Sequence, residues 1–242
     1  MTNDIGKRKE IMNDGFESLE PRGADCPQSA RLLLLGITIV LAVLSCIGAP
    51  SYAYSGGSLW LQHIGTAALL LILIADLKLR ALSFGACLCL CIFTWLHILG
   101  ARYLYSNVPY TEWAEKFLGW KIEVDLTKPH TNQYDRLVHF AFGLLLMPMF
   151  RQFAERCLKI RRYVMSLLFA WLMVQTFSMI YEVFEWGLSE VMSKEVADGY
   201  NGQQGDAWDA QKDMALAMLG STIAVPIMTL WRLVRKKRSG RQ

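Results

Sequence analysis

The side chains in this sequence that could do chemistry are carboxylates and imidazoles that recur at helical spacing. Residues three or four apart share one face of a helix, because each residue turns the helix by about 100°. An acid and a histidine follow this spacing in "YDRLVHFAFG", two glutamates in "MIYEVFEWG" and three aspartates in "GDAWDAQKDMALAMLG". A further histidine lies near the end of an apolar stretch in "TWLHILGARY". The candidate site residues are His97, Asp135, His139, Glu182, Glu185, Asp206, Asp209 and Asp213.

These residue types are ligands of divalent metal ions. Mixed carboxylate and imidazole ligands suit Zn, Fe or Mn, whereas carboxylates alone suit Mg or Ca. A bound ion would lower the pKa of a bound water, and we predict that Glu185 or Asp209 accepts its proton. No G-x-S-x-G or C-x-x-C nucleophile motif is present. The predicted metal ligands are His97, Asp135, His139, Glu182, Asp206 and Asp213.

Structural roles compete with this interpretation. An aspartate at a helix start, such as Asp135 or Asp209, can cap the helix and stabilise it by roughly 0.5–2 kcal/mol. His139 alone could be a core histidine bonded to a carbonyl group. Proton sharing among the acids, or a charge from Lys212, could also balance the cluster.

The composition indicates what must position these residues. The chain has 242 residues, of which 53% are hydrophobic, and its mean hydropathy is +0.26, which is typical of a membrane protein. Crossing a bilayer takes about 20 apolar residues per helix. We therefore predict an all-α, polytopic membrane helix bundle with about six spans. These are Leu32–Ala49, Leu59–Ala75, Ala81–Ala101, Arg136–Phe153, Val164–Gly187 and Met214–Trp231.

Charge predicts the orientation of the bundle. Basic residues gather at the N-terminus, between spans two and three, between spans four and five, and in the tail "RKKRSGR". By the positive-inside rule both termini are cytoplasmic, and the net charge of +4 indicates no nucleic-acid partner. We expect a flexible cytoplasmic tail over residues 1–30, a membrane domain over 31–235 and a basic tail over 236–242. This orientation places His97, His139, Glu182 and Asp213 on the order of 6 Å inside the extracytoplasmic boundary.

Several neighbouring features bear on this site. Gln175, Ser178, Glu182, Glu185 and Ser189 form a polar stripe on span five, and a carboxylate inside a span persists mainly where it faces a cavity or a partner. On span six the small residues Ala217 and Gly220 continue the face of Asp213, so that another helix can approach closely. Segment 102–134 suits a short interfacial helix or hairpin, "DGYNGQQGD" suits tight turns, and the six cysteines suit apolar packing rather than a metal site.

The motifs "HILGARYLYSNVPY", "YDRLVHFAFGLLL" and "YEVFEWGLSE…GYNGQQGDAWDAQKDMALAMLG" resemble the YjdF-type family of bacterial inner-membrane proteins, a family of unknown function. The resemblance covers roughly residues 32–231. It implies a multi-pass protein of the inner (cytoplasmic) membrane and no established chemistry. The element "YDRLVHFAFGLLL" also resembles an Asp-Lys-x-x-His-Phe element of VanZ-like membrane proteins.

Three function classes remain open from the sequence. The first is a membrane-embedded, metal-dependent hydrolase that acts on a lipid or envelope substrate. The second is a cation- or proton-coupled transporter, although carriers usually place their site near the midplane of the bilayer and the chain shows no clear internal repeat. The third is a structural or partner-binding membrane protein that has no metal.

Overall fold

The computed structural model describes residues 26–121, 132–192 and 206–239, and these residues contain helices and no strand. Six of the helices are long and apolar enough to cross a membrane. The predicted all-α bundle with six spans is therefore confirmed. The elements are α2 (Gln28–Cys46), the 3-10 helix η1 (Ser51–Gly57), α3 (Ser58–Leu79), α4 (Phe84–Arg102), α5 (Tyr110–Leu118), α6 (Tyr134–Arg156), α7 (Tyr163–Val191) and α9 (Asp209–Ser239).

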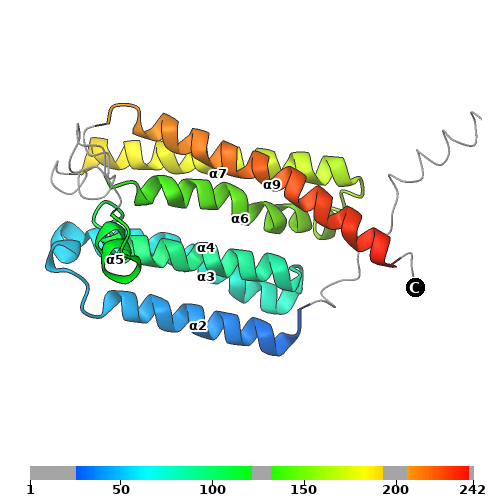
Figure 1. Ribbon diagram of the computed structural model, residues 1–242, viewed down its shortest axis with the longest axis horizontal. Helices are drawn as coiled ribbons and strands as arrows, with labels where there is room; N and C mark the ends of the chain where they lie inside the picture. The colour runs from blue at the N-terminus through cyan, green and yellow to red at the C-terminus, as the bar shows by residue number, and fades with distance from the viewer. Residues whose placement is uncertain (1–25, 122–131, 193–205, 240–242) are drawn as a thin grey trace, which may run out of the picture.

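The long helices form two groups of three (Figure 1). One group contains α2, α3 and α4, and the other contains α6, α7 and α9. The groups meet chiefly where α4 packs on α6, and the most extensive contact in the bundle joins α6 to α9. The start of α2 and the end of α9 lie at the same end of the bundle (Figure 1).

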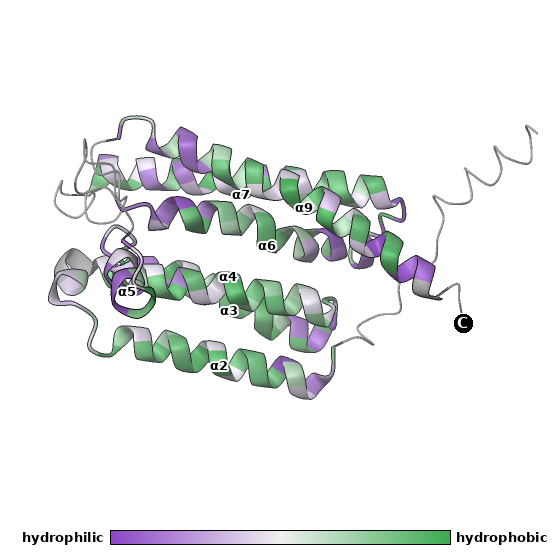
Figure 2. Cartoon of the chain, viewed as in Figure 1, coloured by the Kyte–Doolittle hydropathy of each residue, from purple (hydrophilic) through white to green (hydrophobic). Residues whose placement is uncertain are grey.

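The outside of the bundle is apolar along most of its length. Large side chains such as Leu33, Ile64 and Trp231 are more than half exposed. Figure 2 shows hydrophobic residues along the middle of the helices and hydrophilic residues concentrated at their ends. A water-soluble protein seldom exposes so much contiguous apolar surface. This surface faces the lipid bilayer, which is the first of the predicted partners.

The helices differ from the predicted spans mainly at their ends. The helix α2 stops at Cys46, before the predicted Ala49, because Gly48 takes a left-handed φ of 62°. The helix α9 runs from Asp209 to Ser239 and exceeds the predicted span at both ends. Hydropathy finds only the apolar part of a helix, whereas the backbone hydrogen bonds continue through the charged turns that follow.

The same difference changes the predicted tails. Residues 1–25 and 240–242 lie outside the described residues, whereas residues 28–30 are the first turn of α2 and residues 236–239 belong to α9. Most of "DGYNGQQGD" also lies outside the described residues. The predicted short helix within 102–134 is α5, which ends where Gly119 takes a φ of 67°. Of the cysteines, Cys157 is exposed, so apolar packing does not explain that one.

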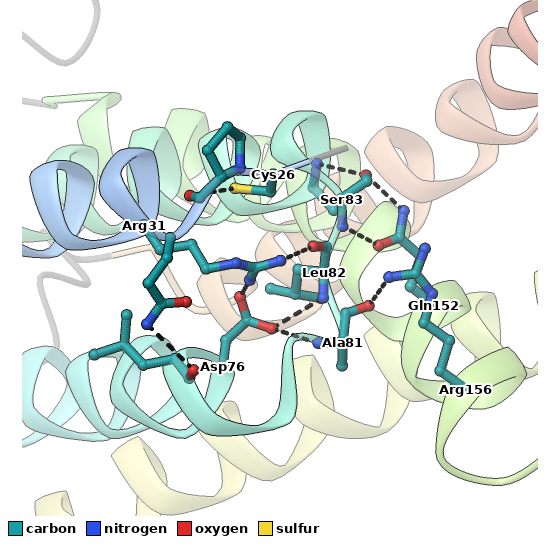
Figure 3. Close-up of polar contacts among 12 residues, drawn as sticks. Cys26, Arg31, Asp76, Ala81, Leu82, Ser83, Gln152 and Arg156 are labelled. Atoms are coloured by element: carbon teal, nitrogen blue, oxygen red, sulfur yellow. Dashed lines mark hydrogen bonds and ion pairs between the residues drawn. The ribbon is translucent and has the colours of Figure 1, made fainter. Parts of the chain in front are cut away.

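A buried ion pair fixes the turn between α3 and α4 (Figure 3). The carboxylate of Asp76 pairs with Arg31 of α2. Its Oδ1 also accepts hydrogen bonds from the backbone N–H groups of Ala81 and Leu82, both at 2.9 Å, and Arg31 donates to the carbonyl oxygen of Leu82 at 2.5 Å. Because every charged atom of the pair lies within the bundle, the turn is held to α2 by charge as well as by packing.

The other side of the turn is held by α6 (Figure 3). The side-chain amide of Gln152 accepts from the Ser83 N–H at 2.7 Å and donates to the Ser83 hydroxyl at 2.8 Å. Arg156 donates to the carbonyl oxygen of Ala81 at 2.5 Å. Ser83 is itself the N-cap of α4. The start of α4 is therefore fixed between α2 and α6, and this sets the line along which α4 carries His97 at its other end.

The contact between α6 and α9 depends on two glycines. A Cβ atom on Gly143 would collide with the backbone of Ala217, and one on Gly220 would collide with the backbone of Phe140. Ala217 is fully buried. Small residues let membrane helices approach backbone to backbone. The predicted close approach of another helix to this face of α9 is confirmed, and the partner is α6.

Candidate metal centre

Asp135, His139 and Asp213 meet at the end of the bundle that carries α5. One ligand atom from each of the three side chains lies within 4.8 Å of the other two. Asp135 and His139 share a face of α6, and Asp213 projects from α9. His139 lies four residues before Gly143, and Asp213 lies four residues before Ala217. The two helices run in the same direction, so the backbone contact one turn deeper in the bundle brings the side chains together.

Glu182 of α7 places a second carboxylate beside His139. Its Oε1 lies 3.4 Å from His139 Nε2, which is also 3.7 Å from Asp135 Oδ1. His139, Glu182 and Asp213 are almost completely buried, and Asp213 is only 2% exposed. Glu182 Oε1 and Asp213 Oδ1 have no hydrogen-bond partner among the described residues. Buried carboxylate oxygens without a donor are costly, so this cluster offers coordination positions for a cation.

Glu185 lies one turn from Glu182 on α7 and is also buried. It interacts electrostatically with Asp135, Glu182 and Asp213. The predicted spacing of the two glutamates therefore does bring both into the same cluster. Three helices contribute acids to it: α6, α7 and α9.

Asp206 and Asp209 lie at the rim of the cluster, where basic side chains pair with them. Arg136 donates to Asp206 at 2.6 Å and to Asp209 at 3.4 Å. Lys212 donates to Asp206 at 2.5 Å. The hydrogen bond from Lys212, with that from the backbone N–H of Trp208, lowers the pKa of Asp206 to about 2. Asp206 thus acts in an ion-pair network at the start of α9 and stands apart from Asp135, His139 and Asp213.

The alternative that Asp135 caps a helix can be checked at the start of α6. The N-cap residue of α6 is Gln133, which makes no side-chain capping bond, and Asp135 lies within the first turn. Asp135 is therefore not the N-cap, although its charge still favours the N-terminal end of the helix. Just before α9, Asp206 Oδ1 accepts from the backbone N–H of Trp208 at 3.1 Å, and Asp209 is the first residue of the helix.

The histidine of α4, His97, lies on the other side of a cavity. Its Nδ1 hydrogen-bonds with the hydroxyl of Tyr105, and its ring packs against Gly65 of α3. His97 is not in the group formed by Asp135, His139 and Asp213. The structure thus divides the predicted ligands into a cluster on α6, α7 and α9, a rim, and one separate histidine.

Tyr105 was not a sequence candidate. It follows α4 in a turn where Leu104 and Tyr105 take φ values of 51° and 53°. This left-handed backbone folds the tyrosine ring back over Gly100 and directs its hydroxyl to His97. Such conformations are rare for residues other than glycine. Neither residue type nor spacing in "RYLYSNVPY" signals this turn.

The cavity has a volume of about 190 Å³ and lies between the two helix groups. Asp135 and His139 border it on one side, and His97 and Tyr105 border it on the other. The rest of its wall is mostly apolar and comes from α3, α4, α6 and α7. Asp135 and His139 of the cluster therefore border a space that a small apolar group can enter.

Arg102 does not supply charge to the cluster. Its guanidinium donates to the carbonyl oxygens of Leu44, Ser45, Ile47 and Gly48 at 2.8–3.1 Å. It therefore bonds to carbonyl groups in the last turn of α2, which a helix end leaves without partners, and in the turn that follows. Arg136 and Lys212 are the basic residues near the acids, and both pair at the rim.

Six membrane-length helices and a buried acid and histidine cluster at one end of the bundle define a polytopic membrane protein. Comparison with known proteins agrees. The model of a family described as predicted membrane protein (DUF2238) matches residues 30–235. The chain belongs to this family.

One relative is the inner membrane protein YjdF of Escherichia coli strain K12, which is 29% identical over 143 residues. The match covers 59% of this chain and 64% of the relative. The chain therefore spans less than two thirds of the length of this relative. No solved structure matches the chain. The resemblance to the YjdF-type family is confirmed, and the protein is a multi-pass membrane protein.

Proposed function

We propose that the protein is a metal-dependent membrane hydrolase that acts on a lipid or envelope substrate, with one divalent ion bound by Asp135, His139 and Asp213. The observation that carries the proposal is the meeting of these three side chains from two helices, with one Asp213 oxygen buried and without a hydrogen-bond donor among the described residues. Glu182 is the fourth side chain of the site.

The donor set suits a catalytic ion. Catalytic zinc sites commonly have three protein ligands and keep one position open. Ligand atoms bound to one tetrahedral ion lie about 3.4 Å apart, given metal–ligand distances of about 2.1 Å. The atoms here lie within 4.8 Å of one another, so small side-chain rotations bring them to that spacing. Mixed carboxylate and imidazole ligands also suit Fe and Mn, and Mg prefers sites where carboxylates dominate.

Glu185 is the better of the two predicted proton acceptors. Asp209 lies at the rim, where its carboxylate is paired with Arg136 at 3.4 Å. Glu185 is buried beside Glu182 and interacts electrostatically with Asp135 and Asp213 of the cluster. A bound ion would supply an activated water at neutral pH, and Glu185 would take the proton of that water.

A second function is favoured by the surroundings of His139. Its Nε2 lies within 3.7 Å of both Asp135 and Glu182, so one proton could be shared among the three groups without a metal. Such a cluster would suit proton- or cation-coupled transport. The two functions differ in whether an ion is bound tightly, which can be measured directly.

The test is the metal content of the purified protein. The wild type, Asp213→Asn, Glu182→Gln and the rim variant Asp206→Asn are purified in the same detergent and analysed by inductively coupled plasma mass spectrometry. We expect close to one divalent ion per chain in the wild type and Asp206→Asn, and a large loss in Asp213→Asn and Glu182→Gln. Hydrolysis of total inner-membrane lipids is then assayed with the loaded wild type.

The outcomes separate the candidates. Metal far below one ion per chain in the wild type, with no change in Asp213→Asn, would rule out the metal site and favour proton sharing around His139. Bound metal without lipid hydrolysis would favour cation transport. Loss of metal in Asp206→Asn alone would move the site from the cluster to the rim.

A further inference from the structure

Ser178 lines the cavity and has an unused hydroxyl. It is 3% exposed, and its Oγ has no hydrogen-bond partner among the described residues. The other serine and threonine side chains of the same helix donate to the carbonyl oxygen three or four residues earlier. Those residues are Ser166, Thr176 and Ser189, at 2.6–2.9 Å.

This difference needs a physical reason. Serine and threonine in membrane helices normally satisfy the hydroxyl by bonding back to their own helix. A buried hydroxyl without a partner is unfavourable, more so in a span that water does not reach. Because Ser178 lines the cavity, rotation of its side chain about χ1 can turn this unpaired hydroxyl toward a partner that enters there.

The cavity indicates what kind of molecule that partner is. Its volume of about 190 Å³ is somewhat larger than an engineered cavity of about 150 Å³ that holds benzene. Phe93, Phe142 and Phe177 contribute aromatic rings to its wall. These residues favour a short apolar chain or the first carbons of a longer one.

The polar end of the cavity excludes one class of head group. Asp135 borders the cavity, and Glu182 lies one helical turn, about 6 Å along the axis, from Ser178. A carboxylate or other anion beside Ser178 would be repelled by these acids. A neutral hydroxyl or ester group would not be repelled, and it can bond to a serine hydroxyl as donor or acceptor.

We infer that the cavity binds a neutral amphiphile, with its alcohol or ester group hydrogen-bonded to Ser178 and its apolar chain against the aromatic wall. The role of this amphiphile as a substrate rests on the proposed hydrolase function. Its place in the cavity rests on Ser178 and the cavity wall. The scissile bond of an ester bound there would lie next to the cluster of Asp135 and His139.

Photolabelling can test this placement. The purified protein in lipid nanodiscs is labelled with octan-1-ol that carries a diazirine on its chain, and with the matched diazirine octane that lacks the hydroxyl group. Adducts are mapped by mass spectrometry, and affinities are measured by competition with unlabelled octan-1-ol. The wild type is compared with Ser178→Ala and with Thr176→Val, an exposed hydroxyl on the same helix.

We expect adducts on the cavity wall near Phe93 and Phe142 and a preference of the wild type for the alcohol over the alkane. Loss of one neutral hydrogen bond should reduce this preference about fivefold in Ser178→Ala and leave it unchanged in Thr176→Val. The thermal stability of ligand-free Ser178→Ala should equal or exceed that of the wild type, because the serine loses no bond of its own.

Two results would overturn the inference. One is an equal preference for the alcohol in the wild type and Ser178→Ala. The other is labelling confined to lipid-facing side chains such as Trp60 and Trp231. Metal content is measured on the same samples. A protein without metal that keeps its Ser178-dependent preference would refute the hydrolase proposal and support the amphiphile site.

Discussion

Replacing Gly143 by alanine should weaken the helix contact on which the proposed metal site depends. The added Cβ would collide with the carbonyl group of Ala217 and the backbone nitrogen of Ser221. Because both are backbone atoms, neither can rotate away, and α6 must move from α9. His139 and Asp213 lie one turn from this contact, so the same movement separates a ligand on α6 from a ligand on α9.

The size of the effect follows from overpacking. Extra methyl or methylene groups in a filled interior cost about 1–3 kcal/mol, which lowers the melting temperature by roughly 2–12 °C in a chain of this size. The matched control is Gly36→Ala on α2, where a Cβ would meet nothing within 4 Å. There, the better helix propensity of alanine should leave stability unchanged or raise it by up to about 1 kcal/mol.

The assay combines thermal unfolding in detergent with metal analysis. We expect Gly143→Ala to melt below the wild type and to bind less metal, and Gly36→Ala to match the wild type in both measurements. If Gly143→Ala kept both the melting temperature and the metal content of the wild type, the reasoning from helix approach to site geometry would be refuted. A lower melting temperature with full metal content would show that the ligands are held independently of this contact.

Three further predictions concern other parts of the molecule. Asp76→Asn leaves buried Arg31 without its counter-charge and should lower the free energy of unfolding by about 3–5 kcal/mol. The double variant Arg31→Met, Asp76→Asn removes the unpaired charge and keeps an acceptor for the N–H groups of Ala81 and Leu82, so it should recover most of this loss in the same denaturation assay. The pKa of Asp206 is about 2, and in Lys212→Met it should rise towards 3.8 in an NMR titration. Because the pKa is depressed in the folded protein, the ion pair stabilises the fold above pH 3.8. This stabilisation is lost as the pH falls through about 2. A green fluorescent protein fused after the last residue should fluoresce and an alkaline phosphatase fused there should be inactive, if both termini are cytoplasmic as the charge pattern predicts.

The hydrophobic runs were sufficient to predict the six spans because a membrane helix needs a long apolar segment and little else. Periodicity along one helix also predicted which acids share a face, and Asp135 with His139 and Glu182 with Glu185 do so in the structure. These relations are local. They depend on helical geometry, which the sequence determines directly.

The relations that depend on neighbouring helices were harder to predict. His97 has a suitable depth and residue type, yet α4 packs on the far side of the cavity from α9, and no spacing within one helix reveals that distance. Asp206 was predicted as a metal ligand from its residue type and spacing, whereas in the structure its carboxylate pairs with the side chains of Arg136 and Lys212. Tyr105 depends on two left-handed residues in a turn, for which "RYLYSNVPY" contains no glycine signal.

The arrangement of α6 explains why the cluster and the cavity belong to one site. Its residues Asp135 and His139 contribute to the cluster and also border the cavity. Its Gly143 holds α9 and thereby positions Asp213, while Gln152 at its other end holds the start of α4. A change at either end of α6 therefore alters the relation between the ligand cluster and the cavity wall. If the cavity holds the substrate, variants along α6 should affect metal content and amphiphile binding together, whereas Ser178→Ala on α7 should affect amphiphile binding alone.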